Sequence, residues 1–224
     1  DGRPVYNHNP NGTLNFYDLE LTNISNGGAS NSAAISVSHN WRDGLLDGLS
    51  LLASYTWTHA TDTNPMTSSI ADSSYTRFAS SDVQNPARST SDYEIRNKIA
   101  INFSYERRFF GDYATNISLF FQSRSGLPFS YTFDSSRTTT SVGGAFDNDF
   151  GNWVSTYSGR QAASNALLYV PAADANGNVT ATSDPRVTYG GSFDVTAFNT
   201  LLHNTGLIQY AGRIAPRNRF AGPS

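Results

Sequence analysis

Charged side chains at alternate positions are the first candidates for a binding site in this chain of 224 residues. Glu94, Arg96 and Lys98 project from one face of a predicted strand, and Arg124 joins them if the following strand pairs in register. These four residues are our candidate ligand contacts. The alternative is that the charges pair with one another along the sheet, which is the more common use of such residues.

Two acidic stretches offer oxygen ligands for a hard cation. Their oxygen-bearing side chains are Asp147, Asp149 and Asn152 in the first stretch, and Asp174, Asn176 and Asn178 in the second. Loop oxygens spaced in this way can surround Ca²⁺, but neither stretch has EF-hand spacing, and Asp, Asn and Gly also form turns. Turn formation is the favoured interpretation. A loop-bound calcium at the first stretch is the one cofactor that the sequence suggests.

Aromatic side chains stand in a segment rich in Asn and Ser, from residue 134 to residue 206. Trp153 and Tyr157, with Tyr169, have rings that could stack on a sugar or a peptide. Packing that orders the segment is an equally good explanation. Residues 193–207 also have the spacing of a short helix.

Common catalytic motifs are missing. The chain has no G-x-S-x-G, H-E-x-x-H or S-x-x-K sequence and no Cys, and its four His residues are far apart. We predict that it is not an enzyme. A net charge of -3 and a pI near 5.7 leave no basic surface for nucleic acid.

The composition favours sheet over helix. Charged residues make up 15% of the chain, against roughly 25% in ordinary globular domains. Lys98 is the single Lys, so the residues that usually cover exposed helix faces are scarce. Aromatic residues reach 13%, which is typical of strands. A helical bundle is therefore excluded.

Apolar and polar side chains alternate with a period of two over long segments, as in β-strands. The predicted strands are 33–42, 49–59, 93–106 and 113–125, with a weaker strand at 13–24. The last strand is predicted to extend through 127–133, past a bulge or bend at Gly126 and Pro128. Most of these strands exceed the usual strand of about five or six residues. They match the roughly nine to eleven tilted residues with which a strand crosses a bilayer.

The connections between these strands differ in length. Those at 43–48 and 107–112 are short turns. The connection at 25–32 is of medium length, the one at 60–92 is long, and the one that begins at 134 is very long. Short turns at one end and long loops at the other are typical of outer-membrane barrels. We therefore predict an all-β fold, an antiparallel transmembrane β-barrel, present here as a partial barrel of about five to seven long strands with long extracellular loops.

Six segments add a resemblance to this pattern. They are LTN (21–23), GLSLLASYTWTHATD (48–62), SDYEIRNKIAINFSY (91–105), ISLFFQSRSGLPFSYTF (117–133), ALLYVP (166–171) and GRIAPRNRFAGPS (212–224). In this order they resemble the barrel of TonB-dependent outer-membrane receptors, specifically the Oar-like branch. The resemblance implies a barrel of about 22 strands closed by an N-terminal plug.

The resemblance also implies a function and a place in the cell. Residues 1–224 would be one segment of a receptor barrel, with the plug and the final strands absent and with 134–206 as a long extracellular loop. The protein would lie in the outer membrane of a Gram-negative bacterium and import a siderophore, a glycan or a peptide. Its partners would be the TonB complex, reached through the absent N-terminal region, the rest of its barrel and plug, and outer-membrane lipid and lipopolysaccharide.

Two other functions remain open from the sequence. One is an adhesin or structural barrel that displays binding loops without transport. The other is a soluble β-sandwich that binds carbohydrate. A plug and a TonB box encoded in the same gene would favour transport, and their absence would favour the first alternative.

Overall fold

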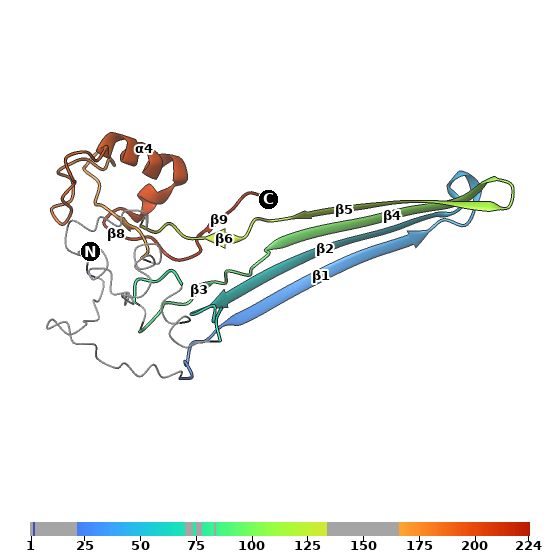
Figure 1. The fold of residues 1–224 in the computed structure, drawn as a ribbon, viewed down its shortest axis with the longest axis horizontal. Coiled ribbons are helices and arrows are strands. Elements are labelled where there is room, and N and C mark those ends of the chain that lie inside the picture. Colours follow the sequence, from blue (N-terminus) through green and yellow to red (C-terminus); the bar gives the residue numbers. More distant parts are fainter. Residues whose placement is uncertain (1, 3–21, 70–73, 75–77, 83, 134–165) are drawn as a thin grey trace. The chain divides into compact units, whose positions relative to one another are not determined.

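The computed structural model describes residues 2, 22–69, 74, 78–82, 84–133 and 166–224, which fold as two compact units (Figure 1). The sheet unit comprises residues 28–62, 90–129 and 220–224. The helix unit comprises residues 1–27, 63–89 and 130–219.

Four long antiparallel strands form the sheet unit: β1 (Ala29–Asn40), β2 (Leu49–Asp62), β4 (Asn97–Phe110) and β5 (Tyr113–Arg124). They are neighbours in the order β1-β2-β4-β5, and the short β3 (Ser89–Thr90) pairs with β2. Each long strand therefore pairs with the long strand that follows it in the chain. Strands make up most of the regular secondary structure of the described residues, and their sheets are antiparallel.

The strand register separates two faces of different chemistry. Odd-numbered residues of all four strands share one face, because Ile35 pairs with Tyr55, Tyr55 with Ile99 and Ile101 with Phe121. Large apolar side chains dominate this apolar face. Even-numbered residues share the opposite, polar face, where the Ser50 and Ser104 hydroxyls lie 2.6 Å apart. The alternation predicted from the sequence is confirmed for these strands.

Some strand boundaries differ from those predicted. β4 begins at Asn97 rather than at residue 93, so Glu94 and Arg96 precede the strand instead of lying on it. The segment 127–133 does not continue β5, which ends at Arg124. Most of the weak strand predicted at 13–24 lies outside the described residues, and its last three residues are not in a strand.

Tight turns join the strands at one end of the sheet. Gly111 and Asp112 alone connect β4 to β5, and Gly111 has φ +62°, a backbone conformation that Gly adopts without steric cost. Between β1 and β2 the chain forms a 3-10 helix, η1 (Gly44–Leu46), and then Gly48 at φ +86°. A Cβ atom at Gly48 would lie 2.0 Å from the Glu106 carbonyl oxygen. Only Gly fits this position.

Two short strands, β6 (Pro128–Phe129) and β9 (Phe220–Ala221), pair antiparallel in the sheet unit. The Phe129 and Phe220 ring centroids are 5.9 Å apart. Gly126 makes the bend between β5 and β6, where a Cβ atom would lie 2.0 Å from the Gly222 carbonyl oxygen. This close approach of main chains explains why β5 stops before the predicted extension.

The helix unit has its own core. It contains β7 (Tyr169–Val170) paired with β8 (Arg213–Ile214), the helix α4 (Val195–Thr205) and the 3-10 helix η2 (Leu207–Tyr210). The largest fully buried side chains are Val170, Leu202 and Leu207.

Helix α4 confirms the helix predicted within residues 193–207. It begins where the Asp194 side chain accepts a hydrogen bond from the Ala197 N–H, and it ends at Gly206, which is left-handed at φ +74°. Within the described residues, no helix has the length and apolar character needed to cross a membrane.

Candidate functional site

Glu94 is the centre of a cluster at the end of β2. Its carboxylate accepts hydrogen bonds from the Ala60 N–H at 2.6 Å and from Arg96 Nε at 2.7 Å, and its Oε2 lies 2.9 Å from His59 Nδ1. An ionised carboxylate only accepts, so Nδ1 donates in this contact. The Glu94 side chain is 2% exposed, whereas those of Arg96 and His59 are about half exposed. We call these three residues and Ala60 the Glu94 cluster.

The backbone register explains why a carboxylate is needed here. The Thr58 N–H donates to the Arg96 carbonyl, which continues the β2-β4 ladder by one step beyond the end of β4. Two residues further along β2, Ala60 N–H would meet the carbonyl of residue 94 but instead donates to the Glu94 side chain. The Ala60 carbonyl accepts from the Ser91 N–H. The side chain thus replaces a main-chain acceptor where the two strands separate.

The pKa of Glu94 follows from these contacts. Burial alone would raise it, but the hydrogen bonds from Ala60, Arg96 and His59 outweigh burial and hold the pKa below its usual value of 4.5. Glu94 is therefore ionised at neutral pH and satisfied by its own chain. Mutual charge pairing, the alternative raised from the sequence, accounts for Glu94 and Arg96.

Lys98 and Arg124 are arranged differently. They lie directly opposite each other in the β4-β5 register, on the polar face, and both side chains are exposed. We call them the cation pair. The described residues provide neither of them with a carboxylate partner. Like charges directly opposite each other in a sheet destabilise it.

The other predicted site residues divide into two groups. Trp153, Tyr157, Asp147, Asp149 and Asn152 lie outside the described residues. The second group lies within the helix unit and consists of Tyr169, Asp174, Asn176 and Asn178.

Asp174 forms a turn rather than an open ligand set. Its Oδ1 accepts from the Asn176 and Asn178 N–H groups at 2.9 and 3.0 Å. Tyr169 is 6% exposed, so its ring is not a free stacking surface. Among the described residues, no three His, Asp or Glu side chains gather as a metal-binding group would require.

The sequence did not indicate Asp184, the most buried carboxylate among the described residues of the helix unit. It is 2% exposed and accepts from the Tyr169 hydroxyl at 2.6 Å, the Ala172 N–H at 2.8 Å and the Arg186 N–H at 2.9 Å. Burial would raise the pKa of Asp184, but these hydrogen bonds lower it well below the usual range. Burial and the bond to Asp184 raise the pKa of Tyr169 to about 12. The carboxylate of Asp184 is therefore satisfied by hydrogen bonds from its own chain.

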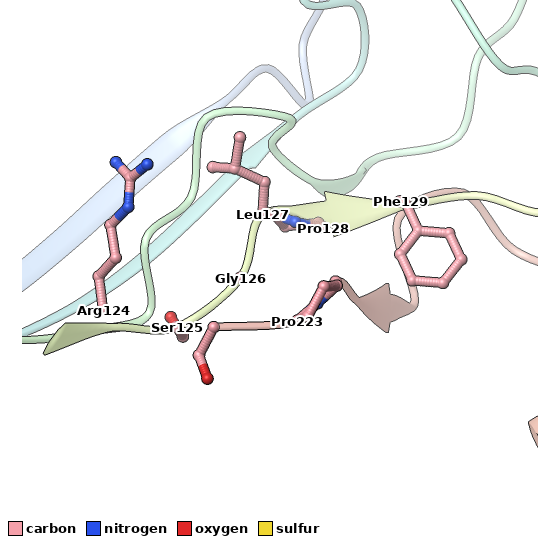
Figure 2. Close-up of a pocket in the computed structure, with 9 residues that line it drawn as sticks. Arg124, Ser125, Gly126, Leu127, Pro128, Phe129 and Pro223 are labelled. Atoms are coloured by element: carbon pink, nitrogen blue, oxygen red, sulfur yellow. The ribbon is translucent and has the colours of Figure 1, made fainter.

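A cavity of about 420 Å³ lies where β5 leads into β6 (Figure 2). Residues 124–129 and 222–224 line it, and Arg124 contributes its one charged side chain. The rest of its lining is main chain, the hydroxyl-bearing Ser125 and Ser224, and the apolar side chains of Leu127, Pro128, Phe129 and Pro223. No His, Asp or Glu side chain, which could act as a general base, is among its lining residues.

Comparison of the chain with protein-family models, with curated proteins and with solved structures finds no match.

Proposed function

We propose that the sheet unit is part of the wall of a β-barrel in a bacterial outer membrane, and that the protein is a TonB-dependent receptor that imports a scarce nutrient. The observation that carries this proposal is the one-sided sheet. Side chains such as Ile35 and Leu119 are each 65% exposed on the apolar face, although a soluble sheet would cover them with another layer. In the proposed barrel, membrane lipid covers the apolar face.

Strand length supports the same proposal. β1 and β5 have 12 residues, and β2 and β4 have 14. At about 3.3 Å per residue, a strand of this length extends about 40–46 Å, and a tilt of about 45° reduces its reach across the membrane to about 28–33 Å. The hydrocarbon core of a bilayer is about 30 Å thick.

The polar face and the unequal connections also fit a barrel. The polar face is rich in Ser, Thr and Asn and carries Lys98 and Arg124, as a water-filled lumen requires. In a receptor, the tight turns at Gly48 and Gly111 would face the periplasm, and the long connections would face outside. The remaining strands, the plug, the TonB complex and lipopolysaccharide are the partners proposed for it.

Two adjacent residues of β5 test the membrane assignment. Leu119 lies on the apolar face and Ser118 on the polar face, both near the middle of the strand. We expect Leu119→Arg to destabilise the protein in the outer membrane by about 2–4 kcal/mol and Ser118→Arg by about 1 kcal/mol or less. The measurement is denaturant unfolding of the complete gene product in lipid vesicles. Equal effects of the two substitutions would contradict a lipid-facing apolar surface.

Import is tested in cells. We compare wild-type cells, cells without the gene and cells without TonB, each grown on a defined oligopeptide, a glycan or a ferric siderophore as the limiting nutrient. The proposal expects the same growth defect in both mutants on one of these nutrients. Normal growth of the gene deletion on all of them, with loss of surface attachment, would instead support the adhesin. That alternative is favoured by the separate core of the helix unit, which suits a displayed binding module.

A further inference from the structure

We propose that the cation pair, Lys98 and Arg124, binds an oxyanionic group of the imported ligand, a carboxylate or a phosphate, at the entrance of the barrel. This inference rests on the proposed function, because it places the polar face toward a water-filled lumen. It narrows the substrate class to molecules that carry such a group.

The register brings the two cations as close as neighbouring strands allow. The Ser125 N–H donates to the Asn97 carbonyl at 2.8 Å, so residues 97 and 125 form a hydrogen-bonded pair. The next pair, Lys98 and Arg124, is then a non-hydrogen-bonded pair, in which side chains approach most closely, with Cβ atoms about 4.5–5.5 Å apart. The Asn97 N–H also donates to the Ser125 hydroxyl at 3.1 Å. These bonds hold the ends of β4 and β5 together and keep the cations opposed.

The surroundings of the pair contain no carboxylate that could neutralise it among the described residues. On the polar face its nearest register neighbours are Thr56, Ala100 and Gln122, all uncharged. Glu94 is occupied by Arg96, His59 and Ala60. Glu106 lies on the same face but eight residues along β4, at the end with the tight turn.

The position of the pair suits capture of a ligand from solution. Lys98 is the second residue of β4 and Arg124 the last of β5, so both lie at the end of the sheet with the long connections. In a receptor this is the outer end. The planar guanidinium of Arg124 can donate two parallel hydrogen bonds to a carboxylate or phosphate, and the Lys98 ammonium adds a point charge. The hydroxyl of Thr56 and the amide of Gln122 supply neutral donors beside them.

The test measures anion binding by the complete receptor, purified in detergent and titrated by calorimetry. The probes are inorganic phosphate, acetyl-tetraalanine with a free carboxylate, and the uncharged C-terminal amide of the same peptide. The variants are Lys98→Gln and Arg124→Gln. The matched control is Arg108→Gln, which removes one positive charge from the polar-face register at the other end of β4.

We expect at least one anionic probe to bind wild-type protein, and each of the two variants to weaken it about tenfold, because a hydrogen bond to a charged group is lost. The control should bind as wild type does. Preference for phosphate or for the peptide acid identifies the group. Binding of neither anion, equal binding of the acid and its amide, or equal loss in the control would each overturn the inference.

A fourth variant checks that the cations are not needed for folding. Lys98→Glu places a carboxylate opposite Arg124, so it should insert and resist heat at least as well as wild type while losing the anion. A variant that fails to insert would show that Lys98 pairs with an acid elsewhere in the protein and would overturn the inference. Intact import in cells without anion binding refutes this inference alone. Anion binding without TonB-dependent growth refutes the proposed transport function instead.

Discussion

Replacing Glu94 with Gln removes one negative charge from the buried end of the β2-β4 pair and preserves the shape of the side chain. The amide oxygen of the substituted side chain can still accept from the Ala60 N–H, but as a neutral acceptor. A hydrogen bond to a charged group contributes about 1.5–3 kcal/mol and a neutral one about 0.5–1.5 kcal/mol, so this bond loses about 1 kcal/mol. The contacts with Arg96 and His59 involve half-exposed partners, so water screening limits their loss to about 1 kcal/mol.

The total of about 2 kcal/mol corresponds to roughly thirtyfold more frequent opening of this strand end. The assay is amide hydrogen exchange followed by mass spectrometry on the complete protein in lipid vesicles. The reporters are the amides of Ala60 and Ser91, whose hydrogen bonds depend on the Glu94 cluster. We expect protection at these two amides to fall roughly thirtyfold in Glu94→Gln, while protection in the middle of β2 is unchanged.

Glu106→Gln is the matched control, because Glu106 is an exposed carboxylate on β4, the strand that follows Glu94. It should leave exchange at Ala60 within about twofold of wild type. The wild-type protein should also respond to pH. Since the folded pKa of Glu94 lies below 4.5, its contribution is complete above pH 4.5 and is lost as pH falls through the folded value. Unchanged protection of Ala60 in Glu94→Gln would refute the role of this carboxylate as the acceptor that closes the strand end.

Two further predictions concern single contacts in the two units. Gly48→Ala should impair formation of the β1-β2 hairpin by well over about 1 kcal/mol, because it adds a clash with the Glu106 carbonyl to the strain of a positive φ. Gly44 has φ +73° but open space around it, so Gly44→Ala should lower the free energy of unfolding by only about 1 kcal/mol. Denaturant unfolding measures both losses, and equal losses would show that the clash at Gly48 is unimportant. Tyr169→Phe should destabilise the helix unit by about 1–2 kcal/mol, since it removes a buried hydrogen bond to Asp184. Proteolysis between residues 166 and 187 should become faster, and an unchanged rate would show that this hydrogen bond does not stabilise the segment.

The faces of the long strands could be predicted because alternation is a local property. Tyr55 and Ile99 each belong to an apolar stripe that can be read without knowing their partner, and the register places both on the apolar face. The helix of residues 195–205 was predictable for the same reason, since its apolar spacing and its Asp194 and Gly206 boundaries lie within one short segment. The local spacing of apolar residues was therefore enough to predict the long strands and this helix.

The contacts that end or connect these elements could not be predicted. Glu94 has the spacing of a strand residue, but its partner Ala60 is 34 residues earlier in the chain, and nothing nearby indicates that the side chain replaces a carbonyl. The contact of Gly126 with Gly222 likewise joins distant segments. Asp184 stands among ordinary turn residues, and its burial depends on Tyr169 and Ala172. The cation pair was predicted only conditionally, because its members meet only if β4 and β5 pair in one particular register.

The unequal connections of the sheet suggest an order of assembly. β4 and β5 are joined by two residues, and β1 and β2 by residues 41–48, so each hairpin can form with little loss of chain entropy. Pairing β2 with β4 must close the segment 63–96, which is about four times as long as the β1-β2 connection. Since each doubling of a loop adds about 0.6 kcal/mol to the free energy of closing it, this step costs about 1.2 kcal/mol more. The two hairpins should therefore form first and dock second. The β2-β4 pair would then form last. The hydrogen bond from the Ala60 N–H to the Glu94 carboxylate stabilises the end of this pair, where the two strands separate.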